Sequence, residues 1–302
     1  MRAKTLVHHE VEGPRAKSVS ELIKNLTPKR QEVIRPVLEH PREYVLLTIR
    51  ELAAKANSDA ATILRIVRNM GFASYREFQR YLHDLSIVLA TPFEIMQASL
   101  AKPGTTSAQI KGSLACDMKN LKALSNTLDT FRIKGLAEKL YRARQIVLLG
   151  GDMAIALVLF LEYKLTILGL PPLIAVTPGR VAHLIRCTNK KDVVIAISFR
   201  RGLRQTVEGL TRAKARGAYC IGISDTYISP IARLADVCLL CSIESPSFGG
   251  SYVAPMALLN ALLLGCANYR RSRTLALLKE AEAEQRSGYR WYLGDASTRK
   301  NV

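Results

Sequence analysis

The chain has 302 residues, 48% of them apolar, and a formal net charge of +19 at pH 7. Because this length exceeds that of a usual single domain, we expect two domains, each able to bury a core. The six cysteines lack the spacings of a disulfide framework and no secretory signal opens the chain, so a secreted disulfide scaffold is excluded. The longest apolar stretch, residues 154–176, is broken by charges and two prolines, which excludes a membrane span.

These features predict a reduced, cytoplasmic protein. The positive charge is uneven, since residues 1–100 hold 15 Lys and Arg against 11 Asp and Glu, whereas residues 101–302 hold 29 against 14. Such an excess suits an anionic small ligand, DNA across a whole dimer, or solubility alone, and net charge does not separate the three.

Cys238 and Cys241 have a C-x-x-C spacing but lie in the strand-like run VCLLC without a second pair or a histidine cluster. We therefore expect buried thiols and no metal site.

The residue pattern divides the chain into five segments. Residues 1–18 are polar and charged without periodicity, and we expect them to be disordered. Apolar residues then recur at a spacing of three and four through residues 19–89, which predicts an all-α domain. Residues 90–112, with Pro92, Pro103 and Gly104, predict a connection to a second domain at 113–280, with residues 281–302 as a tail.

Thr27 before Pro28 predicts an N-cap followed by proline at the first helical position, in a helix that runs to about Leu38. Pro36 falls inside this helix and either kinks its last turn or ends it early. A later helix begins near Ser74 and closes the first domain.

Between these helices, residues 48–56 and 59–72 predict two short helices around a tight turn. Asn57 suits the left-handed conformation that the turn requires, Asp59 suits the N-cap of the second helix, and Gly71 suits its C-cap. This arrangement is typical of a helix-turn-helix.

A helix-turn-helix places its second helix in the major groove of DNA. The candidate DNA contacts are the residues that open this helix and the two arginines that follow: Ser58, Asp59, Ala60, Thr62, Ile63, Arg65 and Arg68. Ala61, Leu64 and Val67 are spaced to pack inward.

The second domain has a different pattern, in which short apolar runs alternate with amphipathic segments. The apolar runs lie at 144–151, 172–176, 192–198, 218–224 and 236–242. Because most separations leave room for a crossover helix, the pattern predicts βαβ units, and so an α/β domain with a doubly wound, five-stranded parallel sheet.

In open α/β sheets ligands bind at the carboxyl ends of the strands, where the strand order reverses. For a flavodoxin-like order this crevice lies between the first and third strands. The candidate ligand residues follow those strands: Gly150, Gly151, Asp152, Ala154, Ser198, Arg200, Arg201 and Thr206. Small residues before a helix N-terminus, with arginines and hydroxyls nearby, predict a small anionic ligand.

The string TIRELAAKANSDAATILRIVRNMGFASYREF resembles the N-terminal domain of the RpiR family of bacterial regulators. That family's pattern runs hydrophobic-x-E-L-A, three residues, G-V-S-x-A-T, two hydrophobic residues and R, and then L-G-F. The matching residues are Glu51, Leu52, Ala53, Ala61, Thr62, Arg65, Gly71, Phe72, Tyr75 and Phe78. Asn57, Ser58 and Asp59 stand where the family has Gly, Val and Ser. The resemblance covers most of residues 20–85 and implies a transcription regulator that binds operator DNA.

Residues 130–267 resemble a SIS (sugar isomerase) domain, which in RpiR regulators follows the DNA-binding domain and senses a phosphosugar or related metabolite. The landmarks are YKL, DVVIAISF, TVEGLTRAKARGA, IGISD and SPIARLADVCL. Many SIS domains have G-x-G-S-S after the first strand, where this chain has neither serine and carries Asp152. The second loop, SFRRGLRQT, is similar to a variant S-F-x-x-Y-S-x-x-T, with Gly202 and Leu203 in place of Tyr and Ser.

Two other functions stay open at this point. A sugar-phosphate isomerase needs a general base, for which His183 and Glu244 lie nearest, but no second catalytic group accompanies them. A second domain that only joins subunits is compatible with the apolar helix expected at 253–267. The preferred expectation is a regulator that is not an enzyme, uses no cofactor or metal, and binds double-stranded operator DNA as a homodimer or tetramer. Its effector is a phosphosugar or sugar acid.

Overall fold

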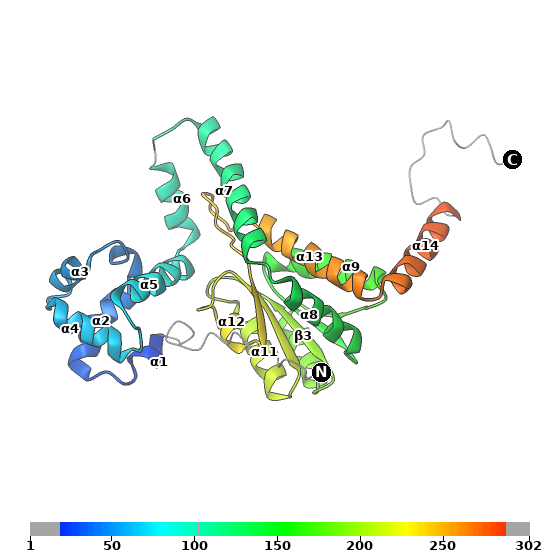
Figure 1. Cartoon of the computed structure of the whole chain (residues 1–302), viewed down its shortest axis with the longest axis horizontal. Coiled ribbons are helices and arrows are strands. Elements are labelled where there is room, and N and C mark those ends of the chain that lie inside the picture. Colours follow the sequence, from blue (N-terminus) through cyan, green and yellow to red (C-terminus); the bar gives the residue numbers. More distant parts are fainter. Residues whose placement is uncertain (1–18, 102, 288–302) are drawn as a thin grey trace, which may run out of the picture.

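The computed structural model describes residues 19–101 and 103–287. The disorder expected for residues 1–18, and the part of the tail at 288–302, lie outside the described residues. Figure 1 shows a helical domain beside an α/β domain, with α6 and α7 projecting above both before the chain enters the sheet.

The helical domain confirms the expected all-α fold. It consists of α1 (Val19–Ile23), α2 (Pro28–Glu39), the short 3-10 helix η2 (Pro41–Glu43), α3 (Ile49–Lys55), α4 (Ala60–Asn69) and α5 (Tyr75–Leu89). Their apolar faces meet in one core, at whose centre Phe72 contacts the rings of Phe78 and Tyr81.

Helix α2 continues through Pro36 to Glu39, so the proline does not end it. Pro36 is exposed, and it removes only the one intrahelical hydrogen bond that its missing N–H would have made. Thr27 stands at the N-cap with extended backbone angles, but its side chain makes no capping hydrogen bond.

The turn between α3 and α4 has the predicted chemistry. Asn57 has φ = +49°, Gly71 has φ = +98°, and the Thr62 N–H donates to Asp59 Oδ1 at 2.8 Å. A capping box that the sequence reasoning overlooked begins α3, where the Thr48 N–H donates to Glu51 Oε2 at 2.7 Å and Thr48 Oγ1 accepts from the Glu51 N–H.

The stretch predicted as a connection is largely helical. It holds α6 (Pro92–Leu100) and the start of α7 (Thr106–Thr127), which is followed by α8 (Thr130–Arg142). Thr91 forms a capping box with Glu94, whose Oε2 accepts from the Thr91 N–H at 2.8 Å. Pro92, taken as a linker residue, is here the first helical position, directly after the N-cap Thr91.

The α/β domain confirms the predicted sheet. Its elements are β1 (Ile146–Leu149), α9 (Ala154–Ile167), β2 (Leu173–Ala175), α10 (Pro178–Arg186), β3 (Val193–Ile197), α11 (Arg204–Ala215), β4 (Tyr219–Ser224), α12 (Pro230–Leu234), β5 (Val237–Leu240), α13 (Val253–Tyr269) and α14 (Arg271–Ser287). The five strands are all parallel in the order β2-β1-β3-β4-β5. This is the flavodoxin-like order, with the switch point between β1 and β3.

Helices cover both faces of the sheet, because neighbouring residues on a strand point to opposite sides. Leu148 and Ile195 pack with α8, α9 and α13 in one core. Val147 and Val194 pack with α10, α11 and α12 in the other. Strands buried on both faces explain the unbroken apolar runs in the sequence.

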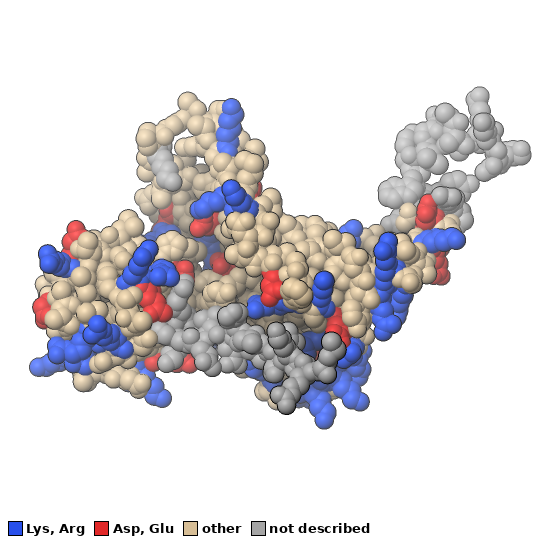
Figure 2. All heavy atoms as spheres, in the orientation of Figure 1, with Lys and Arg blue, Asp and Glu red and all other residues tan. Residues whose placement is uncertain are grey.

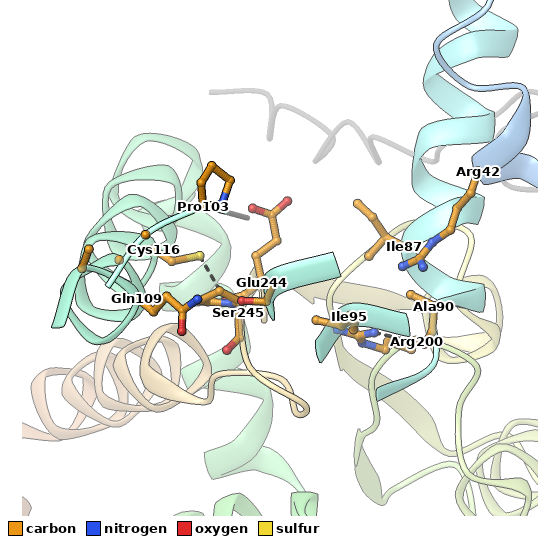
Figure 3. Close-up of a pocket in the computed structure, with 15 residues that line it drawn as sticks. Arg42, Ile87, Ala90, Ile95, Pro103, Gln109, Cys116, Arg200, Glu244 and Ser245 are labelled. Atoms are coloured by element: carbon orange, nitrogen blue, oxygen red, sulfur yellow. Dashed lines mark hydrogen bonds between the residues drawn. The ribbon is translucent and has the colours of Figure 1, made fainter. Parts of the chain in front are cut away.

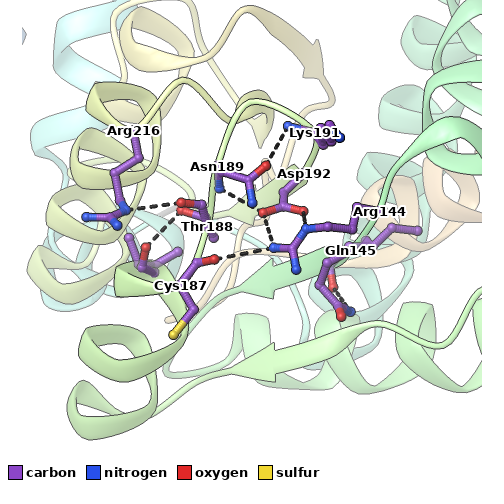
Figure 4. A network of polar contacts seen from close by, with 10 residues as sticks. Arg144, Gln145, Cys187, Thr188, Asn189, Lys191, Asp192 and Arg216 are labelled. Atoms are coloured by element: carbon purple, nitrogen blue, oxygen red, sulfur yellow. Dashed lines mark hydrogen bonds and ion pairs between the residues drawn. The ribbon is translucent and has the colours of Figure 1, made fainter.

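The amino ends of β1 and β3 are joined by a buried carboxylate (Figure 4). The Asp192 side chain is 0% exposed and accepts from Arg144 Nε at 2.9 Å, from Arg144 Nη2 at 2.7 Å and from the Asn189 N–H at 2.8 Å. This network fixes the register in which the two central strands begin, at the edge opposite the candidate crevice.

The apolar stretch 154–176 divides between α9, a loop and β2. None of the helices in the described ranges is long and apolar enough to cross a bilayer. Cys238 lies in β5 and Cys241 directly after it, and burial raises the pKa of the Cys238 thiol to about 12. Cys241 is buried, as expected, whereas Cys238 is half-buried.

Candidate functional site

Helix α4, the second helix of the helix-turn-helix, presents Arg65 and Arg68 to solvent. Its opposite face is buried, and Ile63, Ile66 and Val67 are each 0% exposed. The prediction that Ile63 contacts DNA is therefore wrong, because these residues form the apolar stripe that packs against the rest of the helical domain. Ala61, predicted to pack inward, is exposed instead.

The first turn of α4 is held by its cap. The Thr62 hydroxyl donates to Asp59 Oδ2 at 2.7 Å, so both Asp59 oxygens bind Thr62, and Arg65 Nη2 donates to Thr62 Oγ1 at 3.2 Å. The hydrogen bonds from the Thr62 side chain and backbone hold the pKa of Asp59 below its usual range. Ser58 and Ala60 lie half-buried beside this chain of contacts. DNA contact by these residues and by Arg68 stays a prediction.

Lys and Arg side chains gather on the surface of the helical domain around α4, as Figure 2 shows. Phosphate neutralisation by such groups supplies most of the sequence-independent affinity for DNA. The exposed face of α4 therefore lies within a basic surface of the sign that DNA requires.

The candidate ligand crevice lies where β1 and β3 end side by side. Among the described non-glycine residues, positive φ occurs at Asn57, Asp152 (+53°) and Arg200 (+54°). Two of these three strained positions thus occupy the loops after β1 and β3. Such strain concentrates at ligand sites, where the surrounding structure holds it in place.

The two loops pack closely, and this explains the glycine pair. A Cβ on Gly150 would lie 2.6 Å from Val158 Cγ2, and one on Gly151 would meet the Leu203 side chain and lie 2.7 Å from Gln205 Nε2. Gln205 Nε2 also donates to Val176 O at 3.0 Å, at the end of β2. The Leu203 and Gln205 side chains consequently fill the space directly beside Gly151.

The predicted hydroxyl groups lie at the same edge of the sheet but face inward. Ser198 Oγ accepts from the Leu203 N–H at 3.1 Å and so closes its own loop. Thr206 is 0% exposed, and its Oγ1 has no hydrogen-bond partner within the described ranges. Ala154, at the start of α9, is buried as well, and its N–H donates to Gly151 O at 3.2 Å.

Asp225 is a site residue that the sequence reasoning missed. It follows β4, and its Oδ1 accepts from the Arg200 N–H at 2.8 Å, while its Oδ2 is buried without a hydrogen-bond partner in the described chain. Burial raises the pKa of this carboxyl. The sequence could have indicated Asp225, because it directly follows the apolar run of β4 and so lies at the carboxyl edge of the sheet, one strand from the switch point.

An aromatic pair flanks the same edge. Phe199, after β3, and Tyr252, before α13, have ring centroids 5.4 Å apart. Burial, and then the charges of Asp152 and Asp225, raise the pKa of Tyr252. The carboxyl edge of the sheet therefore brings the carboxyls of Asp152 and Asp225 close to this aromatic pair.

Arg200 and Arg201, predicted as ligand residues, reach the helical domain instead. Arg201 Nη2 donates to Leu89 O at 2.6 Å, and Arg200 Nη1 donates to Ala90 O at 3.3 Å. Arg200 lines a cavity of about 540 Å³ between the domains. Figure 3 shows it beside Ala90, on the same side of the cavity as Arg42 and opposite Glu244.

The two candidate bases for an isomerase are not brought together. His183 is exposed on α10, on one face of the sheet. Glu244 contacts α7 on the other face, where its Oε2 lies 3.0 Å from Lys119 Nζ and its O accepts from Asn120 Nδ2 at 2.8 Å. No catalytic pair forms from these residues.

Comparison with family models gives two matches. The model of the helix-turn-helix domain of the rpiR family matches residues 16–86, and the model of the SIS domain matches residues 139–265. Together the matches contain α4 and both loops of the crevice.

Similar proteins cover the same architecture. An uncharacterised HTH-type transcriptional regulator of Caldanaerobacter subterraneus is 22% identical over 78% of this chain and 83% of its own length. The sugar isomerase domain of an RpiR transcription factor from Sphaerobacter thermophilus is 28% identical with a TM-score of 0.55, over 57% of this chain and 97% of that domain. The Vibrio vulnificus NanR protein, solved with ManNAc-6P, is 17% identical with a TM-score of 0.55, over 88% of this chain and 96% of that one, and shows the shared fold.

Proposed function

Because the chain belongs to the RpiR family of helix-turn-helix regulators with a SIS domain, we propose that it binds operator DNA through α4 and that an anionic sugar derivative modulates this binding. The observation that carries the DNA-binding part is the exposed face of α4, where Arg65 and Arg68 follow a first turn that Asp59 and Thr62 order. An ordered helix start followed by exposed arginines is what base-edge and phosphate contacts require.

Fluorescence anisotropy with labelled DNA from the region upstream of the gene tests this part. We expect Arg65→Ala and Arg68→Ala each to weaken specific binding by about tenfold or more, the effect of losing one base or phosphate contact. Arg142→Ala, on the exposed side of α8, is the matched control and should bind as the wild type does. Unchanged affinity in both α4 variants would refute the assignment.

We propose a homodimer or tetramer as the active form. Ile110, Leu114 and Met118 recur every four residues on α7, and each is more than 60% exposed. Exposed apolar surface of this kind marks subunit interfaces, and a two-fold symmetric dimer places two α4 helices on half-sites of an operator. Sedimentation of the full chain at micromolar concentration should therefore show a species of at least twice the monomer mass.

The proposed ligand site is the crevice after β1 and β3, bounded by Asp152, Arg200, Asp225 and Tyr252. ManNAc-6P is the ligand printed for the similar NanR protein, and glucose 6-phosphate, N-acetylmannosamine 6-phosphate and 6-phosphogluconate are suitable probes. A ligand at 100 times its Kd stabilises the folded state by about 2.7 kcal/mol. We therefore expect a clear rise in Tm with at least one probe and none with uncharged glucose.

A second candidate function has one observation in its favour. Leu203 and Gln205 fill the space beside Gly151, which suits a domain that only joins subunits. Absence of any Tm shift with all three probes, together with an intact oligomer, would favour this candidate over effector sensing.

A further inference from the structure

The acceptors of Arg200 and Arg201 are backbone carbonyl groups at the C-terminal end of α5. Leu89 is the last residue of α5 and Ala90 is its C-cap, so their carbonyl groups have no intrahelical N–H to bind. The C-terminus of a helix also carries a partial negative charge, which attracts a guanidinium group. The two arginines therefore cap the last helix of the DNA-binding domain from a loop of the SIS domain.

The loop is held in this position by its own backbone. Arg200 has φ = +54°, and its N–H is anchored to Asp225 Oδ1 at the end of β4. The next loop along this edge places Ile228 in the core of the helical domain, and Arg233 Nη1 lies 3.9 Å from Glu21 Oε2. One edge of the sheet thus serves both as the candidate ligand crevice and as the interface between domains.

The guanidinium groups consequently have two alternative acceptors. The first are the uncharged carbonyls of Leu89 and Ala90. The second would be the anionic group of a ligand bound in the candidate crevice, which the same loop borders. Hydrogen bonds between an arginine and an anion are about twice as strong as those between neutral groups, and a phosphate binds a guanidinium with two parallel bonds.

We propose that Arg200 and Arg201 couple the two domains, holding the end of α5 when the crevice is empty and leaving it when an anionic sugar derivative binds. We call this pair of contacts the α5 latch. The inference rests on the proposed function, since it takes the effector to be anionic and the helical domain to be the output. Because α5 leads through Thr91 directly into α6, release of its end frees the helical domain to change its position on the connection.

Hydrogen–deuterium exchange of the full chain tests the latch without a ligand. In the double variant Arg200→Ala/Arg201→Ala, amides of residues 85–95 should exchange about tenfold faster, the effect of losing one hydrogen bond to a charged group. Arg204→Ala is the matched control, because Arg204 is exposed in the same basic segment and makes no hydrogen bond or ion pair with residues 19–101 among the described residues. Arg201→Ala alone, at an exposed position, should show part of the effect and guards against misfolding of the double variant.

The same measurement with glucose 6-phosphate, and with glucose as the uncharged control, tests the competition. The phosphate should loosen residues 85–95 in the wild type to the level of the double variant and have no further effect in that variant, and glucose should change neither. Unchanged exchange in both the double and the single variant would overturn the latch. A sugar phosphate that raises the Tm of the wild type but leaves residues 85–95 protected would overturn the competition while leaving effector binding in place. If no sugar phosphate binds at all, effector sensing and the competition both fail, and the variants alone decide whether the arginines hold α5.

Discussion

Ile63 lies in the core of the helical domain, on the face of α4 turned away from Arg65. Ile63→Ala leaves a cavity among fully buried side chains, so we expect the free energy of unfolding to fall by about 3 kcal/mol. Urea denaturation of the full chain followed by circular dichroism measures this loss, and Ala61→Ser on the exposed face should change it little. A variant of wild-type stability that no longer bound the operator would restore Ile63 as a DNA contact.

Asp225 gives the unfolding free energy a predictable pH dependence. Burial raises its pKa in the folded state above the ordinary value of an aspartate, so the native state binds more protons than the unfolded state. Stability contributed by the neutral carboxyl is therefore lost as the pH rises from the unfolded pKa through the folded pKa. We expect Asp225→Asn, which keeps an oxygen for the Arg200 N–H, to become more stable relative to the wild type as the pH rises from 4 to 7.

Urea denaturation at pH 4, 5.5 and 7 checks this dependence. Asp152→Asn, at the neighbouring loop, serves as the control for removing a carboxyl from the same edge. A stability difference between Asp225→Asn and the wild type that does not change with pH would show that the buried carboxyl does not titrate in this range.

The conformations of residues that form turns and helix caps were predictable from the sequence. Asn57, Asp59 and Gly71 have the expected turn and cap geometry, because these depend on a few neighbouring backbone groups. Ile63 was misassigned because α4 is short and carries apolar residues at several spacings, so only packing decides which stripe is buried. Asp225 was missed because its burial depends on strand order and on the loop after β3.

At the scale of elements, the five strands were predictable because a parallel strand buried on both faces is a continuous apolar run. Their flavodoxin-like order was taken as a premise, because apolar runs do not show which strands are neighbours, and the structure confirms it. Helix α6 was missed because Thr91 and Pro92 signal a helix start as well as a linker, and the Glu94 that completes the capping box decides between them. The glycine pair was read as an anion-binding loop, whereas the structure shows that it also makes room for Leu203 and Gln205.

At the scale of the whole molecule, the order of the two domains was evident from the sequence and their interface was not. Arg200 and Ala90 are 110 residues apart, and no periodicity links a loop of one domain to a helix end of the other. The interface joins the carboxyl edge of the sheet to α5 and α1. The part of the SIS domain expected to bind a ligand is therefore also the part that touches the DNA-binding domain.

Ile228 offers a direct test of this interface. It belongs to the loop after β4, yet it is 7% exposed and packs in the core of the helical domain. Ile228→Ala should weaken the coupling between domains by about 2 kcal/mol, because it removes buried apolar contacts without touching either domain's own framework. In scanning calorimetry of the full chain we expect the helical domain to melt earlier than in the wild type, with the α/β transition unchanged. Tyr227→Ala is the neighbouring control, since Tyr227 is 43% exposed. A calorimetric trace for Ile228→Ala that superimposes on the wild type would mean that the two domains do not stabilise one another, and that ligand binding has no path to the DNA-binding domain through this edge.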